Sequence, residues 1–529
     1  MTVGSTSLTT RLVRDRTDVR YYLGEEAPIL TRLKVDGFKN LDRVDLRLGP
    51  FTCIAGPNGV GKSNLFDAIL FLAALAEKPL GESALAVRGG DAPRGDVRTL
   101  FRRAGGQTAD RMRFVAELVI PEEGEDALGQ IAKASMTYLE YRLELRYRPD
   151  TNIKSMGLLE IVREDMSHIN RSVAKTRLGF PHKKAWRDSV IKGRRTSPYI
   201  STEDENGEAV VSLHADSAGG LGGGRPRRVP AASLPRTMLS SVNNAAEHRT
   251  LVLARQEMAS WTQLQLEPSA LRAPDGFTVS RTIGPNGSHL PATLYELAQN
   301  AERHQKGGSD DLYARVANRL SQLVENVRRV GVDVDEKRQL LNIVMTDRYN
   351  TEHIASALSD GTLRFLALTV MEADPKSRRL LCLEEPENGM HPLRIAAVIE
   401  LLRDLAVDVR EPVEADNPLR QVIINTHSPS VVACVHDDAL LLAQSGSGVW
   451  NGTESSRLSI RHLTQTWRVE VEPKEPSVTR GDLLAYLNPL YAIANDDQGG
   501  QAGEAPRVMN REDLQLELPL FGSAETSEP

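Results

Sequence analysis

The sequence predicts an α/β fold in which parallel strands alternate with helices, and three observations carry this prediction. The apolar run Phe51–Gly56 is followed by a glycine-rich loop and then by a stretch with helical periodicity. Two further apolar runs, 380–383 and 422–424, flank the helical stretch 391–407, as in a largely parallel sheet. The 529 residues are 40% hydrophobic and 26% charged, which is typical of a globular chain of about three domains.

The composition excludes several classes of protein. No apolar run approaches the ~20 residues that a membrane helix needs, and the N-terminus lacks the apolar region of a secretory signal. The three cysteines, Cys53, Cys382 and Cys434, lie in apolar stretches and form no CxxC pair. A disulfide framework and a cysteine zinc site are therefore not expected. We expect a cytoplasmic protein with no membrane partner.

The remaining elements follow from periodicity. Alternating apolar and polar residues predict half-buried strands, which come before the glycine loop at 30–38 and 44–49 and after it at 111–120, 138–148 and 158–164. Residues 311–330 place Leu312, Val316, Leu320, Leu323 and Val327 on one face of a predicted helix. Residues 340–347 are predicted as a strand, and a turn at 358–361 opens another helix.

The glycine-rich loop matches the phosphate-binding pattern GxxxxGK[ST]. Its glycines let backbone N–H groups wrap a phosphate, and the helix that follows directs its positive N-terminus at the anion. Lys62 is expected to reach the β- and γ-phosphates, and Ser63 to bind Mg²⁺. The predicted cofactors are ATP and Mg²⁺. The residues expected to hold them are Gly56, Pro57, Asn58, Gly59, Val60, Gly61, Lys62, Ser63 and Asn64.

Two acidic residues end the apolar run 380–383. In P-loop enzymes the first such acid holds Mg²⁺ and an adjacent acid positions or deprotonates water. We therefore expect Glu384 to be a metal ligand together with Ser63, and Glu385 to be catalytic. Glu384 stands where an aspartate is usual, and its longer side chain favours contact with the metal through a water. Taken alone, two glutamates after a strand would be a solvated strand end.

Two further motifs resemble those of ABC-type ATPases. Leu358-Ser359-Asp360-Gly361-Thr362 is similar to the family signature, in which a serine and a glycine face a γ-phosphate bound by the other subunit. His427, in Asn425–Pro429 after the apolar run 422–424, occupies the position of the switch histidine that bonds the γ-phosphate. The resemblance implies binding roles for Ser359 and Gly361 and a catalytic role for His427. An ordinary helix cap and a structural histidine are the alternatives.

Together the motifs resemble the RecF/SMC-like branch of the ABC ATPases, and within it the OLD-like ATPases of bacterial phage defence, including the Septu ATPase subunit. The matching segments are FKNL at Phe38–Leu41, GPNGVGKSN, IGPNGSHLPATLYEL at Ile283–Leu297, ALSDGTLRFLAL, LEEPENGMHP and INTHSP. The resemblance implies an α/β P-loop NTPase of ABC/SMC-head type and a dimer that sandwiches ATP. It places Glu387 and Asn388 in the interface D-loop. The glutamine of the Q-loop is not identified, with Gln107 as a candidate.

The resemblance also divides the chain. We expect a lead-in (1–28), an N-terminal ATPase lobe (29–165), a basic, mixed α/β insertion (166–282), a C-terminal ATPase lobe (283–470) and an extension with a disordered acidic tail (471–529). OLD proteins carry a nuclease domain after the ATPase, but only about a hundred residues follow His427 here, with no separate acidic metal cluster. An intrinsic nuclease is not expected, and the insertion is too short for an SMC-length coiled coil.

Local positive charge indicates a nucleic-acid partner, although the net charge of the whole chain is −6. Residues 163–195 hold ten Lys or Arg and three Asp or Glu, a pattern that suits nucleic-acid phosphates, with Trp186 as a base-stacking candidate. A solvated face or a protein surface is the alternative.

The tail segment Gln515–Phe521, QLELPLF, resembles the motif that docks on the bacterial sliding clamp. Docking on its own ATPase or on a co-encoded subunit is the alternative.

Three functions remain open at this point. The first is an ATP-hydrolysing dimeric switch that controls a separately encoded effector nuclease in anti-phage defence. The second is a RecF-like repair or recombination ATPase that binds or clamps DNA. The third is a non-hydrolysing ATP-binding scaffold for a toxic partner.

Overall fold

A computed structural model describes residues 29–87, 96–149, 157–216, 226–375, 377, 380–414, 416–450, 452–471 and 477–487. The chain divides into two units, residues 1–479 and 480–529. The described element of the second unit is α13 (Arg480–Leu487), and all elements below belong to the first. None of the helices within the described ranges has both the length and the apolarity to cross a bilayer. The predicted tail motif at 515–521 lies outside the described residues.

A six-stranded sheet carries the predicted motifs. Its order is β14 (Thr262–Leu264), β19 (Leu380–Glu384), β20 (Gln421–Thr426), β3 (Phe51–Ala55), β21 (Leu440–Trp450) and β22 (Thr453–His462). Neighbouring strands are parallel from β14 to β21, and β22 is antiparallel to β21. The segments after β14, β19, β20 and β3 therefore emerge at one edge of the sheet. The predicted α/β class is confirmed.

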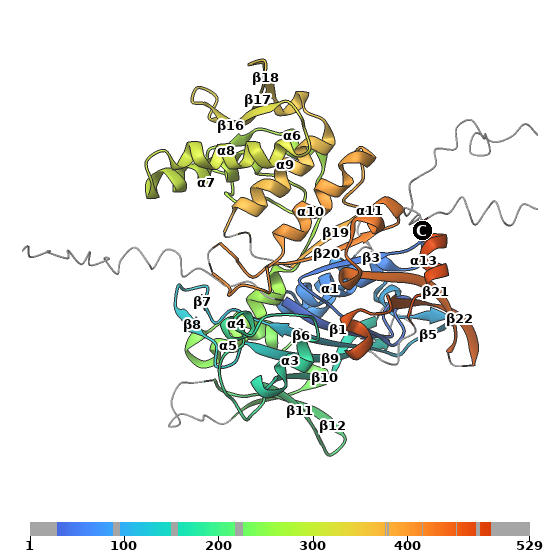
Figure 1. Cartoon of the computed structure of the whole chain (residues 1–529). Coiled ribbons are helices and arrows are strands. Elements are labelled where there is room, and N and C mark those ends of the chain that lie inside the picture. The colour runs from blue at the N-terminus through green and yellow to red at the C-terminus, as the bar shows by residue number, and fades with distance from the viewer. Residues whose placement is uncertain are drawn as a thin grey trace, which may run out of the picture. The chain divides into compact units, whose positions relative to one another are not determined.

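An eight-stranded antiparallel sheet forms the second layer (Figure 1). Its order is β13 (Arg227–Pro230), β12 (Glu208–Leu213), β11 (Ile200–Glu205), β10 (Gly157–His168), β9 (Tyr138–Pro149), β6 (Arg111–Val119), β1 (Ile29–Asp36) and β2 (Val44–Arg47). The helix α1 (Lys62–Glu77) lies between the two sheets, and one apolar core joins it to both. Residues 166–282 add β11–β13 to this sheet and β14 to the other.

The side chain of Gln421 ties the two sheets together. Gln421 is fully buried at the start of β20, and its Oε1 accepts from Leu30 N at 2.8 Å. Its Nε2 donates to Leu30 O at 3.0 Å and to Gly49 O at 2.8 Å. A buried amide is stable only when its donors and acceptor are satisfied, so this residue fixes β20 against β1.

A helical lobe lies beyond the β14–β19 side of the six-stranded sheet (Figure 1). It contains α6 (Pro268–Arg272), α7 (Leu290–His304), α8 (Gly308–Ser321), α9 (Asp360–Ala373) and α10 (Ile395–Leu405), with a small sheet of β15 (Asp275–Gly276), β16 (Val327–Asp335), β17 (Leu340–Asp347) and β18 (Glu352–Ile354). The predicted helix over 311–330 is wrong at its end. It stops at Ser321, and Val327 opens β16, because the alternating segment 327–335 pairs along β17.

Further helices and two short strand pairs border these layers. They are α2 (Leu80–Ala86), α3 (Ala174–Leu178), α4 (Lys184–Val190), α5 (Ala245–Ser260), α11 (Pro429–Cys434), α12 (Trp467–Val471) and the paired strands β4 (Arg103–Ala104) with β5 (Gln107–Thr108) and β7 (Glu123–Glu125) with β8 (Ile131–Lys133).

Candidate functional site

The glycine loop connects β3 to α1 in the conformation that a phosphate cradle needs. Gly59 and Gly61 have φ values of 81° and 107°, which side chains rarely adopt. Lys62 is buried, and its Nζ donates to Gly56 O at 2.6 Å and to Pro57 O at 2.7 Å. Burial lowers the pKa of Lys62, and the nearby carboxylates of the acidic motif oppose that shift. The ammonium group thus lies at the loop and close to the acids.

Asn40, in the turn before β2, braces this loop. Its Nδ2 donates to Val60 O at 2.8 Å, and its Oδ1 accepts from Asn64 Nδ2 at 2.8 Å. A Cβ atom added at Gly61 would meet Asn40 Nδ2 at 2.2 Å, so Gly61 is required by a close contact as well as by its φ. The FKNL segment therefore has a structural task at the phosphate loop that the motif alone does not reveal.

The carboxyl ends of β19 and β20 bring three predicted residues together. His427 Nδ1 lies 2.6 Å from Glu385 Oε1, and Asn388 Nδ2 donates to Glu385 Oε2 at 2.7 Å. Asn425 Nδ2 donates to Glu384 Oε1 at 3.4 Å. Burial opposes ionisation of Glu385, yet the bonds from Asn388 and His427 and the charge of Lys62 hold its pKa below the usual value. Glu385 is therefore an ionised, oriented carboxylate.

A second acid in the same loop is fastened to the histidine segment. The hydroxyl of Thr426 donates to Glu387 Oε1 at 2.5 Å and accepts from Ser428 N at 2.9 Å. Thr426 is fully buried and Glu387 is 9% exposed. Glu387 Oε2 is buried without a hydrogen-bond partner, and burial raises the pKa of this carboxyl. We call this pair of side chains, Glu387 and Thr426, the buried latch; it joins the residues on both sides of His427 to the loop that holds Glu385.

The signature residues begin α9 in the helical lobe. Ser359 caps the helix, with its Oγ accepting from Thr362 N at 3.2 Å. Arg272 donates to Leu358 O at 3.0 Å and to Asp360 Oδ1 at 2.5 Å, which fixes the turn and balances the aspartate. Among the described residues, no hydrogen bond joins Ser359 or Gly361 to the glycine loop of the same chain. The structure thus does not hydrogen-bond the signature to the glycine loop; Gly361 lies instead against the segment after the acidic pair, where an added Cβ atom would meet Gly389 O at 3.2 Å.

Gln265 is a site residue that the sequence alone did not identify. It follows β14, the parallel neighbour of β19. Together with Glu384 and Glu385 it lines a cavity of about 450 Å³, whose lining also includes Arg364 of α9. Arg364 donates to Leu266 O at 3.1 Å and also to Asn388 O. Gln107, the earlier candidate, lies exposed in the two-residue strand β5. The feature of the sequence that could have identified Gln265 is its position directly after a short edge strand.

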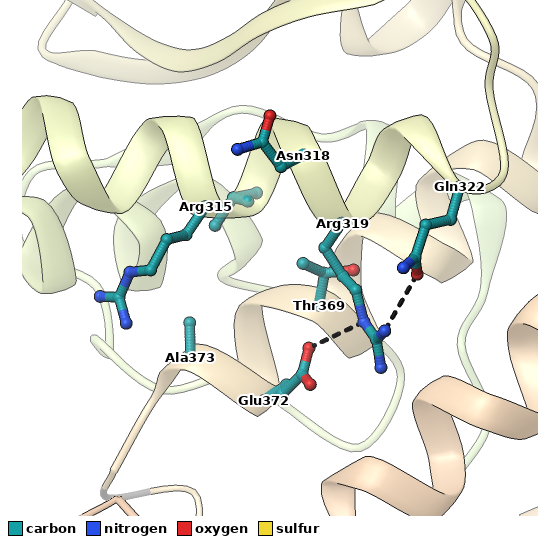
Figure 2. Close-up of a pocket in the computed structure, with 8 residues that line it drawn as sticks. Arg315, Asn318, Arg319, Gln322, Thr369, Glu372 and Ala373 are labelled. Carbon is teal, nitrogen blue, oxygen red and sulfur yellow. Dashed lines mark hydrogen bonds and ion pairs between the residues drawn. The ribbon is translucent and has the colours of Figure 1, made fainter.

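A second cavity, of about 460 Å³, lies between α8 and α9 (Figure 2). Arg319 of α8 lies 3.3 Å from Glu372 of α9 and donates to Gln322 Oε1 at 3.0 Å, so these three lining residues are paired within the chain. The cavity contains none of the predicted site residues.

Several residues of the basic stretch 163–195 are buried or paired, whereas the nucleic-acid prediction requires them to be exposed. Trp186 is fully buried against Phe180 and His182, so its stacking on a base is ruled out. Arg195 bonds the buried Asp216 at 3.0 Å, and Lys183 lies 3.2 Å from Glu411. The apolar surface of Trp186 is needed for a local core, which a charge count cannot show.

These features define the class of the protein: an ABC-type P-loop ATPase of the RecF/SMC kind. The strand order places the phosphate loop, the acidic pair and the histidine at one sheet edge, and a separate helical lobe carries the signature. The chain belongs to the family described as "AAA domain, putative AbiEii toxin, Type IV TA system", which matches residues 51–130 and 177–433, well over half of its length.

Similar proteins extend this comparison. The chain is 51% identical over 41 residues to the OLD nuclease of Thermus scotoductus, and the match spans 8% of each protein. It is also similar to an SMC head bound to the C-terminal winged-helix domain of ScpA, with 15% identity, 82% of this chain and 98% of that chain covered, and a TM-score of 0.41. The SMC head domain from Thermotoga maritima gives 12% identity, 82% and 98% coverage, and a TM-score of 0.33.

Proposed function

We propose that this protein is an ATP-hydrolysing dimeric switch that controls a separately encoded effector, in the manner expected of an anti-phage defence system. The observation that carries the proposal is the 2.6 Å contact between His427 and Glu385 beside the buried Lys62. An ionised carboxylate held by two side chains is poised to orient a water molecule. The family description, with its toxin of a toxin–antitoxin system, supports an effector role beyond the ATPase.

Each residue of the site has a separate role in binding or hydrolysis of ATP. Backbone N–H groups of residues 58–61 and the Lys62 ammonium bind the β- and γ-phosphates. Ser63 and Glu384 supply the hydroxyl and carboxylate oxygens that suit Mg²⁺, which neutralises phosphate charge when bound. Glu385 positions the attacking water, and His427 donates to the γ-phosphate. Gln265 lines the same cavity as Glu384 and Glu385, and Arg364 of the helical lobe lines it as well. We therefore assign to Gln265 the role of transmitting the state of the nucleotide site to the helical lobe.

Ser359 and Gly361 are assigned to the second nucleotide of a dimer. Their lack of a bond to the glycine loop in the same chain supports this assignment, because the helix N-terminus then remains available to another anion. ATP would close the dimer and hydrolysis would open it, and the effector would respond to this change. The proposed effector is a nuclease, in line with the short match to the OLD nuclease.

Glu385→Gln tests the proposal. Glutamine offers one acceptor oxygen where the carboxylate offers two, so it cannot accept from both His427 and Asn388. We expect ATP affinity to be retained and turnover to fall by about 10²–10⁴-fold, the range for loss of a positioned acid–base group. Phosphate release and fluorescent-nucleotide binding measure the two quantities. Lys62→Ala is the matched control, because it should weaken binding itself. Wild-type turnover in Glu385→Gln would exclude the proposed role.

A further inference from the structure

The helix α9, which begins with the signature, ends without a cation of its own. An α-helix leaves its last carbonyl groups without partners inside the helix, and a positive charge near them is stabilising. The last turn of α9 contains no basic residue. Arg420, which is 3% exposed, supplies the donors: its Nη1 donates to Glu372 O at 3.2 Å and its Nη2 to Asp374 O at 2.6 Å. One guanidinium group thus caps the end of α9 that lies opposite Ser359.

The backbone of Arg420 belongs to the six-stranded sheet. Arg420 directly precedes β20, and its backbone oxygen accepts from Val407 N at 3.1 Å. The next residue, Gln421, is the fully buried side chain that fixes β20 against β1. The opposite end of β20 leads into His427. The sheet therefore holds the backbone at Arg420, while the side chain of Arg420 holds the signature helix.

The same end of α9 is also joined to two other helices of the helical lobe. The carboxylate of Glu372 lies 3.3 Å from Arg319 of α8 (Figure 2). Arg319 in turn lies 2.7 Å from Asp404 of α10. Glu372 therefore contacts Arg420 through its carbonyl oxygen and Arg319 through its carboxylate. A displacement of Arg420 would move an end of α9 to which α8 and α10 are attached.

The helix α9 connects Arg420 to the signature without a break. Its 14 residues, Asp360–Ala373, span about 21 Å. Ten of them are buried, and closely packed helices transmit a displacement because protein interiors are hardly compressible. A shift at the C-terminal end of α9 therefore reaches Ser359 and Gly361 at its N-terminal end.

We infer that Arg420 is a positioning residue that couples the sheet of one subunit to the nucleotide bound by the other subunit. The inference rests on the proposed ATP-dependent dimer, in which Ser359 and Gly361 face the second nucleotide. Arg420 and His427 lie on either side of β20, so six strand residues, or about 20 Å, separate them. Arg420 therefore acts through α9 and not by contact with a nucleotide. Its loss should impair the signature that a subunit offers and spare the phosphate loop that the subunit keeps.

Mixed dimers test this direction of coupling. Arg420→Met removes both donated bonds and keeps most of the apolar stem of the side chain. Its homodimer should bind ATP with near wild-type affinity, because the phosphate loop is intact, and should lose up to about 100-fold in turnover, the effect of a small misplacement of a reacting group.

The two mixtures should then differ. Mixed with Lys62→Ala subunits, Arg420→Met should regain phosphate release, because its intact phosphate loop meets the intact signature of the Lys62→Ala subunit. Mixed with Ser359→Arg subunits, it should remain inactive, because both composite sites then contain an impaired signature. A loss that acted through His427 in the same subunit would give the opposite pattern.

Arg468→Met is the matched control. Arg468 is also fully buried and donates to backbone oxygens, those of Asp438 and Arg47, which lie outside α9. Its replacement should lower the stability of the chain without producing a difference between the two mixtures. If Arg420→Met does not fold, Arg420→Lys, which keeps the charge but not the planar fork of donors, should show the same difference with a smaller loss of turnover.

The mixture of Lys62→Ala with Ser359→Arg subunits separates the inference from the proposed dimer. A silent mixture of these two variants would overturn the dimer and the inference together. If that mixture is active, three results would overturn the inference alone: wild-type turnover in Arg420→Met, rescue of Arg420→Met by Ser359→Arg subunits, or the same pattern of rescue in Arg468→Met.

Discussion

Thr426→Val removes one hydroxyl from the centre of the buried latch and preserves the shape of the side chain. The hydroxyl makes two hydrogen bonds, one to Glu387 Oε1 at 2.5 Å and one from Ser428 N at 2.9 Å. Because Glu387 Oε2 already lacks a partner, the substitution leaves this buried carboxyl without a side-chain hydrogen bond. The change therefore tests whether the latch holds the histidine segment against the loop of Glu385.

The expected loss of stability is about 2–6 kcal/mol, since a buried polar group left unsatisfied costs about 1–3 kcal/mol and two groups lose a partner. Turnover should fall while nucleotide affinity stays constant, because Thr426 contacts the phosphate loop through its backbone oxygen, which accepts from Gly56 N at 3.1 Å and is kept in the variant. Thr426→Val/Glu387→Met should recover most of the stability, since replacing both partners by apolar groups of similar shape is nearly neutral. Denaturant midpoints, phosphate release and nucleotide binding provide the three measurements.

The loss of stability caused by Thr426→Val should also depend on pH. Burial raises the pKa of Glu387, so the protonated form is favoured in the folded chain, and the cost of the buried charge appears as pH rises through the folded pKa. The difference in stability between Thr426→Val and wild type should therefore shrink as the pH falls through the raised pKa of Glu387. A single variant as stable and active as wild type, or a double variant with the summed loss, would refute the reasoning.

Local sequence patterns predicted the parts of the site that lie within a strand and its loop. The runs before Gly56, Glu384 and Asn425 are mostly apolar because β3, β19 and β20 are covered on both faces. Parallel pairing then brings residues more than 350 positions apart to one edge without any further signal. That is why Lys62, Glu385 and His427 could be assigned before their contacts were known.

The residues that escaped prediction act through partners distant in sequence. Gln265 follows a three-residue strand, too short for periodicity to stand out, and only its pairing with β19 places it at the site. Asn40 was noticed as part of a motif, but its bonds to Val60 and Asn64 depend on how β1 packs against the phosphate loop. The burial of Trp186 and the ion pair of Arg195 with Asp216 depend on tertiary contacts, so a count of charges overestimated the free cations of that stretch.

Two further predictions concern the nucleotide site. If Ser359 acts across a dimer interface, Lys62→Ala and Ser359→Arg homodimers should both be inactive, whereas their mixture should regain part of the phosphate release; mixtures that form heterodimers yet remain silent would argue against the shared site. Asn40→Ala should raise the dissociation constant for ATP by about tenfold with little change in turnover at saturation, because two bonds worth ~1 kcal/mol each brace the phosphate loop and neither touches Glu385. Asn40→Asp is the matched control: its carboxylate still accepts from Asn64 but cannot donate to Val60 O, so its affinity should lie between the two. Wild-type affinity in Asn40→Ala would mean that the loop keeps its shape without the brace, and that Gly59 and Gly61 alone determine its conformation.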